Sequence, residues 1–466
     1  MRVRLTAAVI AGKMAHYLGK ISGGRGSSLP GLVALRVYPG TLAALAGQMR
    51  QGAIMVTGTN GKTTTNNMLA RVLESRGNRV VVNREGANLI SGVTTAFVKA
   101  CGIRGRLGYD WALLEVDEAA FPRVAEIIKP KIVIVTNFFR DQLDRYGELD
   151  KTVSFIKTTI RQVPEVKLVL NADDPLVAQL GGMNLPVVYY GLGAPLRNNE
   201  EQGITREARF CPRCGREFVY AYYHYSQLGA FRCPGCGFAR PPAQVEALSI
   251  SMLDGDLSCR VRVNERLVGL TLPVSGFYNT YNALAVFGAG LCLGLDPRGV
   301  AASLRGYVPA TGRLQKFVYK GKPIYLNLVK NPAGFNESLN LLKNSTEPKD
   351  VFIALNDNAA DGRDISWIWD VDFERLENCN NVLRFVCSGS RAEEVALRLK
   401  YAGVPVRKID VCSNIITSVR KVLEGMGSTG YLLATYTALW PAERVLRRYA
   451  KEVNGANRMP SLPRPS

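Results

Sequence analysis

Residues 56–65 read VTGTNGKTTT, and this stretch decides which fold the sequence predicts. Residues 53–57 form a short apolar run of strand length, and residues 63–76 show a helical pattern. A glycine-rich turn between a strand and a helix binds phosphate, because its backbone N–H groups and the helix N-terminus attract an anion. The sequence therefore predicts a nucleotide-binding loop made of Gly58, Thr59, Asn60, Gly61, Lys62, Thr63 and Thr64.

Two side chains of this loop carry its expected chemistry. A lysine at the position of Lys62 reaches the outer phosphates of ATP, and a hydroxyl at the position of Thr63 ligates magnesium. Lys62 is expected to lie in a loop rather than in a core. Lys62→Ala should therefore stop ATP turnover and leave the fold intact.

Apolar runs of strand length continue after the loop and alternate with helical stretches. In the first half of the chain they cover residues 79–83, 112–116, 131–136, 168–170 and 187–190. A second alternation begins near residue 315, with strands at 316–319, 324–328 and 351–355 and a helix at 333–343. Such alternation is typical of parallel sheets with helices on both faces, so the predicted fold class is α/β.

Composition divides the chain of 466 residues into four segments. Residues 1–45 are expected to form a basic helical segment, with an amphipathic helix, a Gly/Ser loop and a second short helix. Residues 46–312 form the predicted central P-loop ATPase domain, and residues 313–450 form a predicted C-terminal, Rossmann-like α/β domain. Residues 451–466 contain three prolines and are expected to be a flexible tail.

The charge of the chain is strongly basic and unevenly distributed. Lys and Arg number 59 against 39 Asp and Glu, a formal net charge of +20, and nine basic residues precede the first acid, Glu74. Basic ends suit nucleic acid, an anionic membrane surface or a phosphorylated substrate. The apolar run at residues 5–12 is too short to span a bilayer, and no cleavage site follows it. The expected location is therefore the cytoplasm.

Four of the ten cysteines form two Cys-Pro-x-Cys-Gly knuckles, at Cys211, Cys214, Cys233 and Cys236. Two such turns supply the four thiolates that a tetrahedral zinc ion prefers. The sequence therefore predicts a zinc ribbon inserted at residues 205–242. Four thiolates leave no open coordination position, so the zinc is expected to be structural. The aromatic residues between the knuckles either form the core of the ribbon or stack on nucleobases.

An Asp-rich segment, LNDNAADGRDISWIWD, follows the apolar run at 351–355 and spans residues 355–370. It places Asp357, Asp361 and Asp364 on a glycine-containing loop at the carboxyl end of a predicted strand. Ligand sites of parallel sheets collect at such ends, so this segment is a second candidate site.

The GTNGKTT form of the loop resembles that of the Mur ligase superfamily. The resemblance implies that Glu115 holds the magnesium ion of the nucleotide, that Asn282 lies near the adenine and that Arg313 meets the phosphates. Mur ligases usually carry a histidine where this chain has Gln142, and a carbamylated lysine for which Lys157 is an approximate match. Whether these two residues support a second metal ion stays open.

The cysteine ribbon, the KNPAG stretch at 330–334 and the Asp-rich segment resemble the MurT family, over residues from about 10 to about 445. Members of this family are Mur ligase-like subunits of lipid II isoglutaminyl synthase. The resemblance implies ATP-dependent amidation of the D-glutamate α-carboxylate of lipid II through an acyl phosphate, in peptidoglycan biosynthesis. It implies ATP, Mg²⁺ and Zn²⁺ as cofactors and Asp364 as the catalytic residue, with Asp361 and Asp357 as alternatives.

The resemblance also implies a partner, the glutamine amidotransferase subunit GatD, and a location at the inner face of the plasma membrane. The chain has only two histidines, His16 and His224, so it offers few candidates for the Cys–His pair that a glutaminase needs. Two other functions stay open at this point. One is a free-standing ligase of the Mur or folylpolyglutamate type that adds an amino acid. The other is a zinc-ribbon ATPase that binds nucleic acid, which the order of the Mur-like motifs disfavours.

Overall fold

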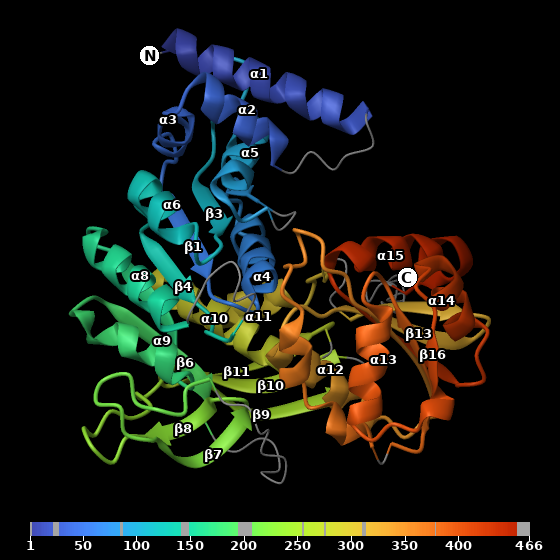
Figure 1. The fold of residues 1–466 in the computed structure, drawn as a ribbon. Coiled ribbons are helices and arrows are strands. Elements are labelled where there is room, and N and C mark those ends of the chain that lie inside the picture. The colour runs from blue at the N-terminus through green and yellow to red at the C-terminus, as the bar shows by residue number, and fades with distance from the viewer. Residues whose placement is uncertain are drawn as a thin grey trace, which may run out of the picture.

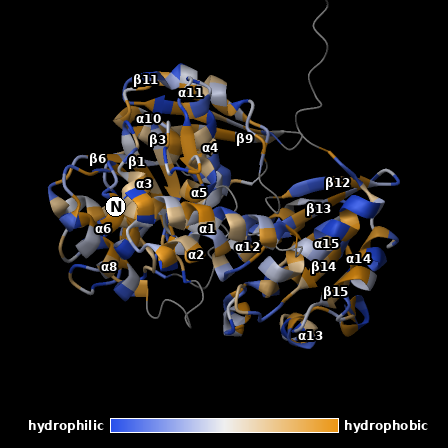
Figure 2. Cartoon of the chain, turned by 90° about the horizontal axis from the view of Figure 1, so that it is seen from above, coloured by the Kyte–Doolittle hydropathy of each residue, from blue (hydrophilic) through white to orange (hydrophobic). Residues whose placement is uncertain are grey.

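The strands of the computed structural model form a nine-stranded sheet, a seven-stranded sheet and a two-stranded ribbon within the residues that it describes. These are residues 2–21, 28–83, 87–140, 149–193, 207–253, 256–274, 276–309, 314–377 and 379–453. The two large sheets lie side by side, each with its own helices (Figures 1 and 2).

The nine-stranded sheet has the order β11-β10-β9-β6-β5-β4-β1-β3-β2. Its strands are β1 (Gly52–Thr57), β2 (Val80–Val82), β3 (Trp111–Glu115), β4 (Ile132–Val135), β5 (Lys167–Asn171), β6 (Val187–Leu192), β9 (Val245–Leu253), β10 (Asp256–Val263) and β11 (Arg266–Leu272). The strands from β9 to β2 run parallel, whereas β10 pairs antiparallel with both β9 and β11. The predicted parallel sheet is therefore present, with an antiparallel extension at one edge.

Successive residues of β1 enter different cores, because side chains of a strand alternate between its two faces. Ile54 and Val56 pack on one face with α4 (Lys62–Glu74), α10 (Tyr278–Cys292) and α11 (Pro297–Leu304). Ala53 and Met55 pack on the other face. The core on that face also contains side chains from α1 (Arg2–Ile21), α2 (Leu29–Val37), α3 (Thr41–Ala46), α5 (Ile90–Ala100), α6 (Phe121–Ile128), α8 (Leu149–Gln162), α9 (Pro175–Ala178) and the 3₁₀ helix η1 (Gln179–Met183).

The seven-stranded sheet has the order β16-β15-β14-β17-β13-β12-β18. Its strands are β12 (Gln315–Tyr319), β13 (Lys322–Leu328), β14 (Lys349–Ala354), β15 (Val382–Ser388), β16 (Ile409–Val411), β17 (Thr429–Ala434) and β18 (Lys451–Glu452). One face packs on α12 (Pro332–Asn344), α13 (Ala392–Tyr401) and the 3₁₀ helices η2 (Ser366–Asp370) and η3 (Phe373–Leu376), and η4 (Val406–Lys408) precedes β16. The other face packs on α14 (Ile415–Leu423) and α15 (Tyr436–Tyr449).

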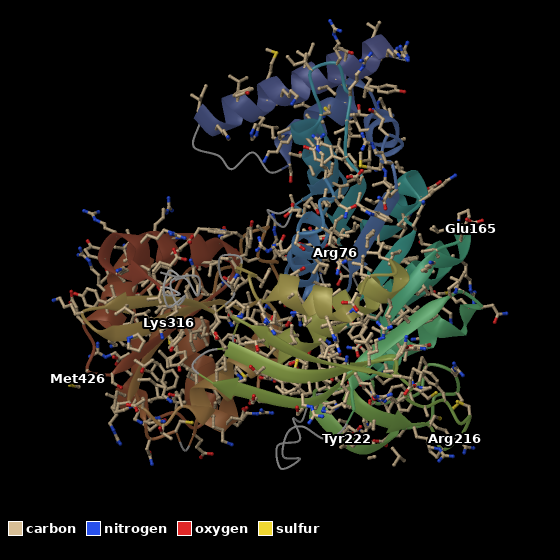
Figure 3. The ribbon with its side chains drawn as sticks, turned by 180° about the vertical axis from the view of Figure 1, so that it is seen from behind. Arg76, Glu165, Arg216, Tyr222, Lys316 and Met426 are labelled. Atoms are coloured by element: carbon tan, nitrogen blue, oxygen red, sulfur yellow. The ribbon has the colours of Figure 1, made fainter. Side chains whose placement is uncertain are left out.

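The ribbon consists of β7 (Val219–Tyr225) and β8 (Leu228–Arg232), which pair antiparallel. It lies at the end of the molecule opposite α1, as Figure 1 shows and as the labelled Arg216 and Tyr222 show in Figure 3. A small core of its own joins Phe218, Phe231 and Phe238 to Cys211 and Cys233.

The predicted tail differs from the structure at its first residues. Lys451 and Glu452 form β18 and pair antiparallel with β12, and the Val453 N–H donates to the Lys316 backbone oxygen at 2.9 Å. The Glu452 carboxylate also accepts hydrogen bonds from the Gln315 and Arg447 side chains. The rest of that segment, from residue 454, and the predicted domain boundary at residue 312 lie outside the described residues. Among the helices that the structure describes, none combines the length and the apolarity that crossing a bilayer requires.

Candidate active site

The loop between β1 and α4 needs glycine at two positions. Gly58 has φ of 113° and Gly61 has φ of 87°, both in the left-handed region. A Cβ atom on Gly58 would lie 2.4 Å from the Thr136 hydroxyl oxygen, and one on Gly61 would lie 2.1 Å from Asn282 Oδ1. Any larger residue would therefore meet both backbone strain and a steric clash.

This loop is held by the segment that follows β4. Asn137 accepts hydrogen bonds from the Thr59 N–H through its backbone oxygen and from the Asn60 N–H through Oδ1, each at 2.8 Å. The Phe139 N–H donates to the Thr59 hydroxyl at 3.0 Å. Two strand ends that are neighbours in the sheet therefore fix the conformation of the phosphate loop before any ligand binds.

Lys62 is the first residue of α4 and is buried, so the expectation that it lies in a loop outside the core is wrong. Its ammonium donates to the Gly58 backbone oxygen at 2.6 Å and to Glu118 at 3.0 Å. Burial lowers the pKa of Lys62, but the negative charges of Glu118, Asp117 and Glu115 outweigh this effect and raise it. The side chain is therefore held as a cation beside the glycine loop.

Glu115 ends β3 and pairs in register with Val56, which lies two positions before Gly58, the first residue of the loop. The Asn88 side chain donates to its Oε1 at 3.4 Å. Its Oε2 is buried and has no hydrogen-bond partner among the described residues. A buried carboxylate oxygen without a partner costs free energy unless a cation covers it, and Mg²⁺ prefers such oxygen ligands. The Glu115 carboxylate therefore fits a magnesium ion. Thr63, the other predicted ligand, is partly exposed on the first turn of α4.

A cleft opens beside the phosphate loop and is lined by both large units. It contains about 740 Å³ of space, part of it open to solvent. The first unit contributes Asn60, Gly61, Thr64, Thr136, Asn137, Tyr190, Tyr225, Tyr278, Tyr281 and Asn282. The second unit contributes Asn327, Leu328, Lys330, Asn331, Ala333, Gly334 and Glu337. A pocket of this size, with apolar rings and a few polar groups, suits a nucleotide.

Asn331 joins the second unit to the phosphate loop. Its side-chain amide donates to Asn60 Oδ1 at 3.0 Å, and Asn60 donates back to Asn331 Oδ1 at 3.3 Å. Asn331 is fully buried and also caps α12, by accepting from the Gly334 N–H at 2.9 Å. The Asn-Pro pair at a helix start predicts this cap, but the partner of the other end of the side chain is 271 residues away.

Tyr225 of the ribbon reaches the cleft, and it is one of the aromatic residues that the sequence assigns either to the ribbon core or to stacking on nucleobases. It stacks on Phe139 with ring centroids 5.7 Å apart and meets Tyr281 edge-on at 6.0 Å. The prediction of a ribbon core is confirmed for Phe218 and Phe231, but it is wrong for Tyr225, which packs against the sheet and α10 instead. Gln227 fixes this end of the ribbon by donating to the Phe138 backbone oxygen at 2.6 Å.

The four knuckle cysteines converge. Their sulfur atoms all lie within 4.8 Å of one another, with 3.4 Å between Cys214 and Cys233 and 3.6 Å between Cys211 and Cys236. Tetrahedral zinc with four thiolates places sulfur atoms about 3.8 Å apart. The backbone N–H groups of Cys236 and Gly235 outweigh burial and lower the pKa of Cys233 to about 6. The donor set and its spacing therefore fit a zinc ion.

The three acids of the Asp-rich loop do not converge on one point. Asp357 pairs with Arg391 at 2.7 Å, and Asp361 accepts from the Thr437 N–H at 2.7 Å. Asp364 accepts from the Ser366 N–H at 2.8 Å, and this bonding lowers its pKa, whereas burial raises that of Asp361. The residues around the cleft do not include any of the three.

The other predicted site residues have different outcomes. Asn282 lines the cleft and accepts from the Thr65 hydroxyl at 3.3 Å. Lys157 lies in α8 and does not line the cleft. Arg313 and Gln142 lie outside the described residues.

The similarity to known proteins extends over nearly the whole chain. The Mur ligase middle domain family matches residues 56–212, and the MurT ligase C-terminal family matches residues 328–439. The "Lipid II isoglutaminyl synthase (glutamine-hydrolyzing) subunit MurT" of Staphylococcus aureus (strain N315) is 38% identical over 96% of this chain and 98% of its own length. The protein of the same name from Streptococcus pneumoniae (strain ATCC BAA-255 / R6) is 35% identical over 94% and 96%.

Solved structures show the same fold at lower identity. A pseudomurein peptide ligase type C from Methanothermus fervidus superposes with a TM-score of 0.64 and 22% identity. The match covers 87% of this chain and 80% of that one. The Mur ligase-like α/β fold is therefore confirmed.

Proposed function

The chain belongs to the MurT family of Mur ligase-like synthase subunits, and on this premise we propose that it amidates the D-glutamate α-carboxylate of the lipid II stem peptide in peptidoglycan biosynthesis. The relatives that are named lipid II isoglutaminyl synthase support the substrate. The observation that carries the ATP-dependent chemistry is the preformed phosphate loop, whose residues Asn60, Gly61 and Thr64 line a cleft. Behind it lie the buried Lys62–Glu118 pair and the Glu115 oxygen that has no hydrogen-bond partner among the described residues.

The reaction needs an activated acyl group, because a carboxylate is a poor electrophile at neutral pH. The D-glutamate carboxylate oxygen attacks the γ-phosphorus of ATP, the bond to the β-phosphate oxygen breaks, and ADP leaves. Ammonia then attacks the acyl phosphate, phosphate leaves, and the nitrogen loses a proton to give the amide. The products are D-isoglutamine, ADP and phosphate.

The nucleotide lies in the cleft, with its phosphates on the loop at 58–64 and its base among the tyrosines. Lys62 supplies positive charge to the phosphoryl group in transfer, and the loop N–H groups orient it. Asn282 and Tyr225 lie where a base can contact them, since both line the same cleft. Arg313 is expected to meet the phosphates from the linker between the two units.

The metal ions have separate proposed roles. Glu115 and Thr63 would hold Mg²⁺, which neutralises negative charge on the phosphates when bound. Cys211, Cys214, Cys233 and Cys236 would hold Zn²⁺, and the resulting ribbon places Tyr225 and Gln227 against the wall of the cleft. The proposed role of zinc is therefore structural. It affects nucleotide binding indirectly, because it holds the ribbon whose strand β7 carries Tyr225.

Asp364 is proposed as the catalytic residue that receives ammonia. Its pKa is lowered by hydrogen bonds from Ser366, so its carboxylate is ionised at neutral pH and attracts ammonium or orients ammonia. Asp361 and Asp357 are held by Thr437 and Arg391, which leaves them less free to bind a substrate. Ammonia is supplied by a glutaminase subunit, GatD, and the pair works at the inner face of the plasma membrane.

Mass spectrometry of lipid II tests this function directly. With ATP, Mg²⁺ and ammonium, the purified chain should convert the stem peptide with the mass change of an OH-to-NH₂ exchange. Asp364→Asn should slow this conversion by about a hundredfold or more while ATP still binds, because it removes the negative charge that attracts ammonium or orients ammonia. Asp357→Asn and Asp361→Asn are matched controls and should have smaller effects. A mass gain equal to an amino-acid residue would contradict the proposal and assign the chain to the amino-acid ligases.

Zinc removal should weaken nucleotide binding as well as stability. Metal analysis should find about one zinc ion per chain, and Cys211→Ser should lower the unfolding temperature. Because Tyr225 reaches the cleft from the ribbon, Cys211→Ser should also raise the Kd for ATP severalfold at temperatures where the rest of the chain stays folded. Cys412→Ser, at a partly exposed cysteine outside the ribbon, is the control. A metal-free chain with full stability and unchanged ATP affinity would refute the role of zinc.

A further inference from the structure

Helix α1 presents two apolar faces, and only one of them is used by the fold. The inner face packs closely on α2 and α5 through Leu5, Val9 and Gly12. A Cβ atom on Gly12 would lie only 2.8 Å from the Pro30 backbone oxygen, so this contact has no spare room. The packing of α1 on the rest of the chain therefore uses the inner face and leaves the outer face out.

The outer face carries a second stripe of large apolar side chains, which are Val3, Ile10, Met14, Tyr17 and Ile21. Their exposed fractions are 83%, 40%, 60%, 67% and 83%. With about 100° of rotation per residue, these five positions lie within about 60° of one another around the helix. The stripe is opposite the inner face, and α1 is the outermost layer at its end of the molecule (Figures 1 and 3).

Basic side chains flank this stripe. Arg2, Lys13 and Lys20 lie on one side of it and Arg4 lies on the other, by the same helical rotation. No acidic residue occurs before Glu74, so no carboxylate of this segment offsets the positive charge. A second copy of the chain seated on this face would bring identical basic flanks together, which costs free energy. An anionic surface instead complements both the apolar stripe and its flanks.

We propose that the outer face of α1 lies on the anionic surface of a phospholipid membrane. A helix with an apolar stripe between basic flanks places its apolar side chains at the boundary between headgroups and acyl chains, with its axis parallel to the surface. Twenty residues give α1 a length of about 30 Å, but it lacks the apolarity that crossing a bilayer requires, so it would lie along the surface. The proposal extends the membrane location given under the proposed function by assigning it to one helix face.

Co-sedimentation of the full chain with lipid vesicles tests this face. Vesicles of phosphatidylglycerol and phosphatidylcholine should bind the chain, and vesicles of phosphatidylcholine alone should bind it much more weakly. The triple variant Ile10→Gln, Met14→Gln, Tyr17→Gln should lose at least about tenfold in binding, because it removes apolar area from the interface. Lys13→Gln and Lys20→Gln should each weaken binding by about fivefold at low salt.

A matched control separates this face from general surface apolarity. The triple variant Val406→Gln, Val411→Gln, Met426→Gln removes three exposed apolar side chains from the other unit and should bind vesicles like the unaltered chain. Equal binding by the α1 variant would overturn the proposal. So would an α1 variant that fails to join the glutaminase subunit while the unaltered chain ignores vesicles, because the face would then be a protein interface. The assay contains neither ATP nor lipid II, so a chain that binds vesicles without amidating supports this inference and refutes only the proposed function.

Discussion

Lys62→Ala should lower ATP turnover by on the order of a thousandfold, since it removes the cation closest to the phosphate loop from the site of phosphoryl transfer. It should also destabilise the chain. Lys62 and Glu118 are an ion pair at 3.0 Å with both side chains 7% exposed. Removing one partner of a buried pair leaves an uncompensated charge and costs about 3 kcal/mol of unfolding free energy. Turnover by a phosphate assay and stability by urea unfolding measure the two effects separately.

A double variant separates the lost chemistry from the lost stability. Glu118→Gln added to Lys62→Ala replaces the buried carboxylate by a neutral amide of the same shape, so most of the lost stability should return. Turnover should stay low, because the amide does not restore the cation. A double variant that is both stable and active would contradict the phosphate-loop interpretation. Glu118→Gln alone completes the cycle and measures how much Glu118 itself contributes.

The sequence predicts the parts of this site that depend on local pattern. Gly58, Gly61 and the strand before them follow from composition and order, and Glu115 follows from its place at a strand end. The two predicted strands agree with the structure, because a parallel sheet brings the carboxyl ends of β1 and β3 together, whereas the magnesium role of Glu115 stays a prediction. A local sequence pattern is therefore enough to predict a site residue where the topology of the sheet determines its position.

Contacts between distant segments explain what the sequence did not reveal. The burial of Lys62 depends on Glu118, which comes from another strand end, and the Asn60–Asn331 pair joins the two units. Tyr225 lies among aromatic residues between the two cysteine knuckles, so the sequence alone does not separate it from the ribbon core. Its place at the cleft depends on the packing of the ribbon against Phe138 and Phe139. No spacing rule within one segment predicts such pairs, since both partners must first be placed by the fold.

Glutamine should not serve as a nitrogen source for the isolated chain, although ammonium should. A glutaminase needs an accessible thiolate beside a base. The His224 side chain is fully buried, 3.9 Å from Asp173 and in contact with Tyr222 and Tyr281. His16 lies on α1, the helix with the outer stripe, away from the cleft residues. Neither histidine is placed to activate a nucleophile for a substrate in the cleft.

The cysteines lead to the same expectation. Burial raises the pKa of Cys259 and Cys387 to about 12 and that of Cys292 to about 11, so these groups are thiols at neutral pH and poor nucleophiles. The sulfur atoms of the four ribbon cysteines lie within 4.8 Å of one another, in the proposed zinc site. A channelled source of ammonia is valuable because most free ammonia is ammonium at this pH. The glutaminase activity is therefore expected on the partner subunit.

Mass spectrometry of lipid II with each nitrogen source measures this directly. The isolated chain should give the amide with ammonium and almost none with glutamine, and adding the glutaminase subunit should restore glutamine use by orders of magnitude. An Asp364→Asn chain in the complex should lose amidation with both sources if Asp364 handles ammonia itself. It should lose only the glutamine reaction if Asp364 serves the junction between the subunits. Release of glutamate from glutamine by the isolated chain would refute the assignment of glutaminase activity to the partner subunit. The nucleophile and its base would then have to lie within this chain.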